Sequence, residues 1–231
     1  MKTKLALLLA FAALTVSAQT KSVHNWTLKS GAVFPGDYFT AGTTTVVIKN
    51  HGTNCFLKIS ELSTNDWLFF YQCKMNQRQM QLDAEAKQMI ATGMVEATAK
   101  LIRDFPEKVS GAGGWMDAKF IKADSSFLAH PDACLGFQVE DKNGDEYYYC
   151  GVTKELTPEN GKFYNDNGEL VALKSNPLVD VVMSLNRGDK IRLVGKKGPY
   201  LDSMFSIEKI EMIESAADAA VVKKVKEDLG N

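Results

Sequence analysis

Runs of apolar residues predict β-strands in the first third of the chain. The β-branched run Thr43–Lys49, the turn residues Asn50–Asn54 and the apolar stretch Cys55–Ile59 together predict a β-hairpin. The run Trp67–Lys74 (WLFFYQCK) is almost continuously apolar, as in a strand that is covered on both faces, and predicts a third strand. We therefore expect a small antiparallel sheet in this part of the chain.

The period of the pattern changes between Asn76 and Phe105, where apolar residues recur every three or four positions. This spacing, with no proline and a single glycine, predicts a long amphipathic helix that breaks near Gly93 and ends before Pro106. Its apolar stripe comprises Leu82, Ala86, Met89, Ile90, Met94, Ala97, Leu101 and Phe105. Methionines are frequent here, and they form either an adaptable surface for a partner or, as we expect, a face that packs on the protein's own sheet.

A glycine-rich segment, Ser110–Gly114, separates this helix from a second region that is rich in strands. Such a segment is typical of a linker, so we predict a domain boundary there, with one module at residues 19–110 and another at residues 115–231. The second module is expected to contain strands at Trp115–Lys122, Lys190–Val194 and Met204–Ile213, a hairpin formed by Leu135–Asp141 and Glu146–Val152 around Asn143-Gly144, a short helix or strand at Leu178–Leu185, and a last helix opened by a capping box of Ser215 and Asp218. The predicted fold class is α+β and mainly β.

The first eighteen residues, Met1–Ala18, have the pattern of a secretory signal peptide. Lys2 and Lys4 precede an apolar run from Leu5 to Val16, and small residues stand before a cleavage position at Ala18-Gln19. The alternative is a membrane anchor, but the apolar run is shorter than the roughly 20 residues that a spanning helix needs. We therefore expect an exported protein, periplasmic or secreted, with no membrane span in the mature chain.

Export changes the interpretation of the four cysteines. Cys55, Cys73, Cys134 and Cys150 are even in number, and outside the cytosol this favours disulfides over a metal site. Of the three connectivities, we favour the local one, Cys55–Cys73 with Cys134–Cys150, because each pair brackets an expected hairpin. The alternative is four buried free thiols, which pack as small apolar residues. No Cys-x-x-Cys motif is present, so we expect no zinc site and no redox dithiol.

Charge and composition exclude several classes of protein. The chain has 27 Lys+Arg against 28 Asp+Glu, a net charge of −1, and 45% hydrophobic residues. It is therefore neither a disordered polyelectrolyte nor a collagen-like fibre. The balanced charge also argues against a protein that grips nucleic acid by bulk electrostatics.

Residues 115–213 resemble a known type of domain. The order strand, loop, hairpin, long connection and two further strands is combined with the run Leu185–Gly195 (LNRGDKIRLVG) and the alternating strand Phe205–Ile213. In this combination the segment resembles an OB-fold, in particular the tRNA-anticodon-binding-like OB domains of exported bacterial proteins. The resemblance implies a β-barrel in which Gly188-Asp189 make a turn and Gly195 lets the fourth strand leave the barrel. It covers about 100 residues, and residues 19–114 resemble no family.

The resemblance also implies where a ligand would bind. OB-folds bind on the face of strands 2 and 3 and with the loops that join strands 1–2 and 4–5. In this sequence these regions contain Phe137, Tyr147, Tyr149, the loop Lys122–Ala133, Lys196, Lys197 and Tyr200. Aromatic side chains beside lysines can stack on bases or sugar rings. The alternative is that the aromatics are half-buried strand residues and that the lysines lie on a solvated loop.

No catalytic or metal-binding motif is found in the sequence. The nucleophile-elbow, His-Glu-x-x-His and P-loop patterns are absent, and His24, His51 and His130 share no ligand spacing. His51 and Cys55 are more simply a turn residue and a cysteine of a disulfide than a catalytic pair. Asp141-x-Asn143-x-Asp145 has the spacing of a calcium loop's start, but it lacks the distal glutamate and is better interpreted as a hairpin turn.

These observations favour a non-catalytic binding or interaction protein with no cofactor. The expected partner is an extracytoplasmic protein or a glycan, and nucleic acid is not expected. One alternative is a hydrolase of cell-envelope polymers, which would need two carboxylates in a cleft with pKa values pushed apart. The other is a single-strand nucleic-acid binder, which would need a basic aromatic stripe.

Overall fold

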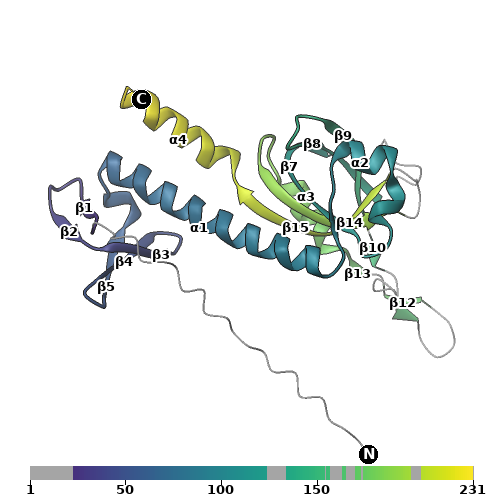
Figure 1. The fold of residues 1–231 in the computed structure, drawn as a ribbon, viewed down its shortest axis with the longest axis horizontal. Helices are drawn as coiled ribbons and strands as arrows, with labels where there is room; N and C mark the ends of the chain where they lie inside the picture. Colours follow the sequence, from purple (N-terminus) through teal and green to yellow (C-terminus); the bar gives the residue numbers. More distant parts are fainter. Residues whose placement is uncertain are drawn as a thin grey trace, which may run out of the picture. The chain divides into compact units, whose positions relative to one another are not determined.

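The computed structural model describes residues 23–123, 134–153, 155–156, 163–164, 170–172, 174–198 and 204–230, so the predicted signal peptide Met1–Ala18 lies outside the described residues. The chain is α+β, with small antiparallel sheets and one larger mixed sheet (Figure 1). It divides into two compact units, the first ending at Tyr71 and the second beginning at Gln72. The division falls within the long helix α1 (Thr64–Ala91), whereas the expected boundary at Ser110–Gly114 lies inside the second unit.

The first unit is built on the predicted small antiparallel sheet. The hairpin is confirmed, because Asn50 pairs with Thr53 around a two-residue turn in which His51 and Gly52 have φ of 48° and 84°. The elements are β1 (Asn25–Thr27) paired with β2 (Val33–Pro35), the sheet β3 (Asp37–Ala41), β4 (Thr45–Asn50) and β5 (Thr53–Lys58), and the 3₁₀ turn η1 (Ile59–Glu61). Trp26, fully buried, lies in its core, and the Trp26 indole N–H donates to the Gly36 carbonyl at 2.8 Å.

The run Trp67–Lys74 is helical, which corrects the prediction of a third strand. Ser63 and Asp66 start the helix, since the Asp66 N–H donates to the Ser63 hydroxyl at 3.2 Å. Within the run, Trp67 stacks on Tyr71 one turn later, with ring centroids 5.7 Å apart. The period of a continuous apolar run does not distinguish a buried strand from a buried helix, and the signal that does so here is the cap at Ser63, four residues before the run.

Asp66 joins the start of α1 to the strand β1. Its carboxylate is 5% exposed and accepts hydrogen bonds from the Ser63 hydroxyl at 2.7 Å, His24 Nε2 at 2.5 Å and the Thr27 N–H at 2.9 Å. Burial raises the pKa of Asp66, but the hydrogen bonds from Ser63, His24 and Thr27 outweigh it, so this pKa lies below its ordinary value. The ionised carboxylate therefore stabilises the folded first unit.

We expect the stability of the first unit to fall in acid because of Asp66. A depressed folded-state pKa gives stability that is present above the unfolded-state pKa and is lost as the pH falls below about 4. Asp66→Asn should remove this pH dependence and cost about 2 kcal/mol at pH 7, through lost charge-assisted hydrogen bonds. Hydrogen exchange of the β4 amides between pH 3 and pH 7 measures both effects. Glu61→Gln, whose carboxylate is an exposed partner of Lys58, is the control and should leave both unchanged.

The amphipathic helix predicted to run to Phe105 is instead two helices. Helix α1 ends at Ala91, near the predicted break, and Gly93 takes a φ of 87°, which ends the helical path. The chain then forms β6 (Val95–Glu96), the short helix α2 (Ala99–Asp104) and the 3₁₀ turn η2 (Pro106–Val109). Thr98 caps α2 by accepting a hydrogen bond from the Leu101 N–H.

The larger sheet of the second unit has pairings that return to their starting strand. Its order is β14-β15-β9-β8-β7-β6, and β14 also pairs with β7. The pair β15–β9 is parallel, and the pairs β7–β8, β8–β9, β14–β15 and β14–β7 are antiparallel. Five of these strands form the closed circuit, namely β7 (Gly114–Ala123), β8 (Cys134–Asp141), β9 (Glu146–Thr153), β14 (Lys190–Lys197) and β15 (Phe205–Glu214). The predicted strands and the predicted hairpin around Asn143-Gly144 are thus confirmed.

The connection between β9 and β14 contains short paired strands and one helix. The elements are β10 (Glu155–Leu156) paired with β13 (Lys174–Ser175), β11 (Phe163–Tyr164) paired with β12 (Leu170–Ala172), and the helix α3 (Pro177–Ser184). Asn176 caps α3 by accepting a hydrogen bond from the Leu178 N–H. The predicted last helix is α4 (Ala216–Asp228), capped by Ser215 through the Asp218 N–H as expected, with Gly230 after its end at a φ of 74°.

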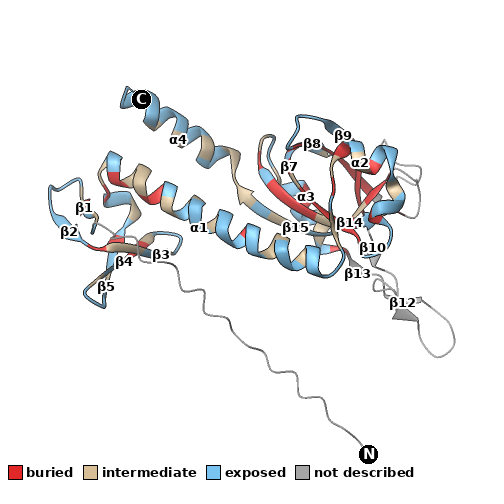
Figure 2. Cartoon of the chain, in the orientation of Figure 1, coloured by how far each residue is buried: buried red, intermediate tan, exposed pale blue. Residues whose placement is uncertain are grey.

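Alternate residues of the five strands form the core of the second unit. Buried residues run along β7, β8 and β14, whereas most of α4 is exposed (Figure 2). On β7 the buried Met116, Ala118 and Phe120 alternate with Asp117 and Lys119, which face outward.

The run Leu185–Gly195 forms the turn before β14 and most of that strand. Gly188 has a φ of 95°, and the buried Asp189 accepts hydrogen bonds from the Asn186 N–H at 2.7 Å and the Ala216 N–H at 2.8 Å. Asp189 thereby fixes the turn before β14 and the first residue of α4. Gly195 lies where the β14–β15 register shifts, and a Cβ there would stand 2.1 Å from the Ser206 carbonyl oxygen.

The described cysteines form no disulfide, which corrects the expected pairs Cys55–Cys73 and Cys134–Cys150. Cys73 lies on α1 rather than on a hairpin strand, so the basis for its pairing is lost. The β8–β9 register sets Cys150 opposite Phe137 and Cys134 opposite Thr153. Cys150 is a buried free thiol whose pKa is raised by burial, so it is unreactive.

Candidate binding site

The residues predicted from the OB resemblance are not gathered into one described surface. Phe137 is 1% exposed and packs in the core, where its ring lies 6.2 Å from that of Phe120. Tyr147 and Tyr149 lie on β9, but their side chains are outside the described part of the structure, as are Tyr200 and most of the loop Lys122–Ala133. Lys196 and Lys197 end β14, and Lys196 pairs with Glu208 at 2.6 Å.

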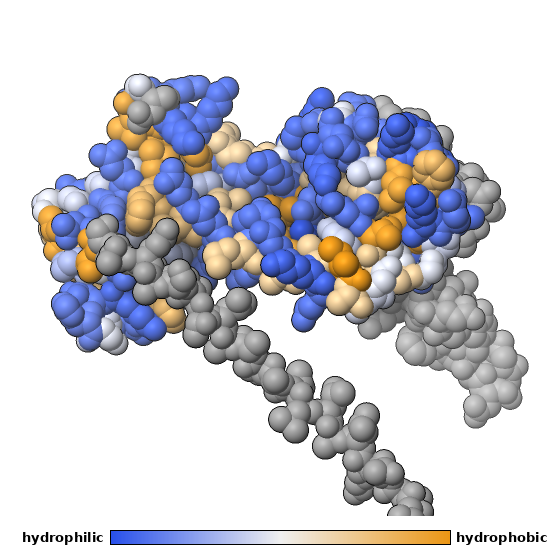
Figure 3. Space-filling model, viewed as in Figure 1, coloured by the Kyte–Doolittle hydropathy of each residue, from blue (hydrophilic) through white to orange (hydrophobic). Residues whose placement is uncertain are grey.

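A cavity of about 290 Å³ lies elsewhere on the second unit, on the outer side of the sheet. Hydrophilic residues cover most of the visible face of this unit, with smaller apolar areas between them (Figure 3). The cavity is lined by three residues of β7, two of β8, one each of β14 and β15, and one residue of the β8–β9 turn. The lining residues are Asp117, Ala118, Lys119, Glu140, Asp141, Lys142, Lys190 and Ile213.

One row of charged residues crosses four strands at this cavity. The register sets Glu140 opposite Lys119, Lys119 opposite Lys190, and Lys190 opposite Glu214. The two lysines are direct neighbours, an arrangement that is unfavourable by itself. Each ammonium group is instead turned to its own carboxylate, with Lys119–Glu140 at 2.8 Å and Lys190–Glu214 at 2.6 Å. The third lysine, Lys142, pairs with Glu96 at 2.5 Å.

The two aspartates of the lining are held by the protein itself. The carboxylate of Asp141 accepts hydrogen bonds from the N–H groups of Ala99, Asn143 and Asp145 at 2.8–3.1 Å. Asp141 thus joins the β8–β9 turn to the start of α2, which supports the interpretation of Asp141–Asp145 as a hairpin turn. Asp117 binds the guanidinium of Arg192 through two hydrogen bonds, from Nε at 2.6 Å and from Nη2 at 2.7 Å.

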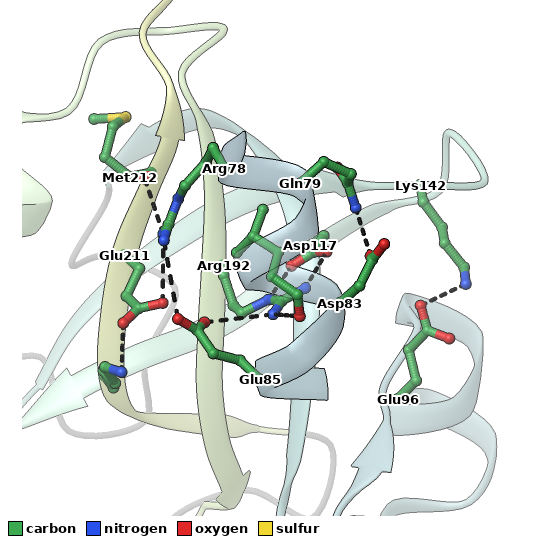
Figure 4. A network of polar contacts seen from close by, with 12 residues as sticks. Arg78, Gln79, Asp83, Glu85, Glu96, Asp117, Lys142, Arg192, Glu211 and Met212 are labelled. Atoms are coloured by element: carbon green, nitrogen blue, oxygen red, sulfur yellow. Dashed lines mark hydrogen bonds and ion pairs between the residues drawn. The ribbon is translucent and has the colours of Figure 1, made fainter. Parts of the chain in front are cut away.

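A second charged row, next to the first, is covered by α1. Asp117, Arg192 and Glu211 are cross-strand neighbours on β7, β14 and β15. The side chain of Arg192 is 2% exposed, and Nη1 donates to the Leu82 carbonyl of α1 at 2.7 Å and lies 3.7 Å from Glu85 Oε2 (Figure 4). Burial lowers the pKa of Arg192. The hydrogen bond and charge of Asp117 and the charges of Glu85 and Glu211 outweigh this effect, so the pKa lies above its ordinary value and the guanidinium stays charged.

Arg78 of α1 extends this cluster to β15. Its guanidinium lies 3.5 Å from Glu211 and 3.9 Å from Glu85, and it donates to the Met212 carbonyl at 3.3 Å (Figure 4). Lys209 also binds Glu211. Burial raises the pKa of Glu211, but the hydrogen bond and charge of Lys209 and the charge of Arg78 outweigh it, so this pKa lies below its ordinary value. Such a carboxylate is a poor proton donor, because a general acid needs a raised pKa.

The remaining candidate groups have structural contacts. His24 binds Asp66 in the first unit, and His51 lies in the β4–β5 turn. Among the described residues no group of three or more His, Cys, Asp or Glu side chains is placed to hold a metal ion. No helix in the described part of the chain has the length and hydropathy needed to cross a membrane.

Sequence reasoning did not identify the residues of the cavity. The available signal was the outward phase of the strand Trp115–Lys122, on which Asp117 and Lys119 alternate with apolar residues. Predicting that Lys119 lies beside Glu140 and Lys190 requires the pairing register of β7, β8 and β14, and no local sequence pattern contains that register. Comparisons with protein-family models, curated proteins and solved structures found no match.

Proposed function

We propose that this chain is an exported, non-catalytic binding protein whose second unit is an OB-like barrel that carries the ligand site. The observation that carries the proposal is the closed circuit of pairings β7–β8–β9–β15–β14–β7. OB-folds are five-stranded Greek-key barrels whose outer surface and loops bind oligosaccharides and oligonucleotides. The pattern of the first eighteen residues supports export.

The chemistry of the described residues favours binding over catalysis. The carboxylates of Glu85, Asp117 and Glu211 lie around Arg78 and Arg192, and α1 covers this cluster. Ion pairs of this kind keep carboxylates charged rather than pushing their pKa values apart. The open cavity beside this cluster offers donors, acceptors and apolar atoms, which is the composition of a binding site.

Thermal unfolding of the chain from Gln19 to Asn231 in the presence of candidate ligands tests this function. The panel consists of cell-envelope glycans, divalent cations and short single-stranded oligonucleotides. A ligand present at about 100 times its Kd stabilises the folded state by about 2.7 kcal/mol, which raises Tm by about 5–10 °C for a unit of this size. We expect this shift with a glycan, and a panel without any shift would contradict the proposed function. Release of reducing ends from a glycan during the incubation would instead establish the hydrolase.

A further inference from the structure

We infer that two copies of this chain form a symmetric dimer through the free edge of β5 in the first unit, which pairs antiparallel with β5 of the second copy. This inference goes beyond the proposed function, because it concerns a surface of the first unit and not the ligand site of the second. Three observations carry it: the unpaired backbone groups of β5, the regular and exposed form of this edge strand, and a register in which β5 is complementary to itself.

The edge of β5 that faces away from β4 carries unpaired backbone groups. The order of the sheet is β3-β4-β5, so β4 pairs with one edge of β5 and leaves the other free. The Ile59 N–H donates to the Thr44 carbonyl at 2.9 Å in the register of the β4–β5 ladder, so the odd-numbered residues of β5 bond to β4. The N–H and C=O groups of Asn54, Phe56 and Lys58 therefore lie on the free edge. In the described part of the chain no hydrogen bond reaches these backbone groups.

β5 has few of the features by which proteins protect an edge strand. Bulges, prolines and inward-pointing charges keep an edge from pairing with another chain. The ladder between β4 and β5 has no register shift, and β5 contains no proline, whereas the opposite edge strand β3 has a bulge between Tyr38 and Thr40. Most of β5 is exposed (Figure 2), and the side chain of Phe56 is 70% exposed. A regular edge with an exposed aromatic residue is a template for the addition of a further strand.

The free edge of β5 is complementary to itself in one antiparallel register. With the two-fold axis at Phe56, this residue lies opposite its equivalent in the second copy, and Asn54 lies opposite Lys58 of the second copy. Each opposed pair exchanges two hydrogen bonds, so every free N–H and C=O of both edges is bonded. Any shift of the axis along β5 leaves some of these groups unpaired. A shift to Lys58 also sets two ammonium groups opposite each other, which is unfavourable.

Charge and apolar contact favour the same register. Lys58 is the one charged residue of β5, and its ammonium group pairs with Glu61 at 3.0 Å, so the neutral Asn54 of the second copy meets a compensated charge. The two Phe56 side chains are cross-strand neighbours at the axis, and such aromatic pairs are stabilising. A second copy thus satisfies the hydrogen bonds and the charges of the edge, and an isologous contact of this kind closes with two chains.

Sedimentation equilibrium of the chain from Gln19 to Asn231, over micromolar to millimolar concentrations, measures the association. A contact made by one strand of each copy is smaller than a standard protein interface. We therefore expect a monomer–dimer equilibrium with a Kd on the order of 100 μM and no larger species.

Hydrogen exchange of the same chain locates the contact on β5. At a concentration about ten times the Kd, about a fifth of the copies are monomeric by mass action. The amides of Asn54, Phe56 and Lys58 should then exchange about fivefold more slowly than in dilute solution. The amides of Cys55 and Leu57, which bond to β4, should be protected at both concentrations.

Charge substitutions at the axis test the register. Phe56→Lys sets two ammonium groups opposite each other and should weaken the association at least tenfold, and Phe56→Glu should do the same with two carboxylates. An equimolar mixture of the two variants should associate again, because opposite charges then face each other. The matched control is Val33→Lys on β2, which changes another exposed apolar residue of the first unit, 54% exposed, and should leave the Kd unchanged. Unaltered melting of the variants shows that they fold.

Three results would overturn the inference. The first is a chain that stays monomeric over the whole concentration range. The second is a dimer that persists unchanged in Phe56→Lys. The third is a dimer in which the free-edge amides of β5 exchange as fast as in dilute solution, since another surface would then form the contact. None of these results bears on the ligand panel, so the proposed binding function is decided separately by its own Tm shifts.

Discussion

Replacing Arg192 by alanine is expected to destabilise the second unit by about 3 kcal/mol, because a buried ion pair that loses one partner leaves the other charge unpaired. The guanidinium is 2% exposed and binds Asp117 through two hydrogen bonds and the Leu82 carbonyl through a third. The substitution would leave Asp117 and Glu85 without this cation. This expected loss of stability is at the low end of the range for buried pairs, because the side chains of Glu85 and Asp117 are each about one-third exposed to solvent.

Hydrogen exchange measures which strands and helices are destabilised by the substitution. Amides of β14, β15 and the part of α1 after Gln72 should lose protection in Arg192→Ala, whereas amides of β4 in the first unit should keep it. Lys196→Met on the same strand is the matched control, because its exposed ion pair with Glu208 should contribute less than about 1 kcal/mol. Arg192→Lys keeps the charge but not the planar fork, so it should fall between the two. Equal losses in Arg192→Ala and Lys196→Met would mean that the cluster does not hold α1 to the sheet.

The sequence was informative wherever a local signal determines a local structure. Asn143-Gly144 marked the β8–β9 turn, Ser215 with Asp218 marked the start of α4, and Gly93 marked the place where a helix ends. Each of these depends on a residue that satisfies a backbone group or takes a positive φ within a few positions. The run Trp67–Lys74 was predicted wrongly as a strand because a nearly continuous apolar run is compatible with a strand and with a helix. Only the cap at Ser63 favours the helix.

The pairing of distant residues was not accessible from local patterns. The disulfides were expected from the even number of cysteines and from export, but cross-strand distance depends on register, and the register sets Cys150 opposite Phe137. The same is true of the cavity, because Lys119 and Lys190 become neighbours only when β14 pairs with β7. Arg192 was part of the run used for the resemblance, yet its burial depends on α1, more than a hundred residues earlier in the chain. Charged residues inside a predicted strand are therefore the positions where a site is most easily missed.

Gly195→Ala should be the most damaging substitution of a small residue in the second unit, with an expected cost of about 3 kcal/mol or more, at the upper end of overpacking effects. A Cβ at this position would lie 2.1 Å from the Ser206 carbonyl oxygen and 3.0 Å from its carbonyl carbon. Both atoms belong to the backbone of the neighbouring strand, so no side chain can move aside. Relief requires that β14 and β15 separate at the bulge between Val194 and Gly195, where Gly195 is also paired with Gly114 of β7. The pairings β14–β15 and β14–β7 that complete the circuit of five strands are therefore strained together.

Denaturant unfolding and hydrogen exchange measure this effect, with Gly111→Ala as the matched control. Gly111 belongs to the same unit, a Cβ there meets nothing within 4 Å, and its φ is outside the left-handed region. Its substitution should change the stability by less than about 0.5 kcal/mol. In Gly195→Ala the β14 and β15 amides near the bulge should exchange faster than those of the β8–β9 hairpin. If the two variants unfold at the same denaturant concentration, the strands tolerate the extra methyl group, and the tight approach of β14 to β15 is not what closes the circuit. If Gly195→Ala alone is destabilised, closure at this bulge contributes to the stability of the whole unit.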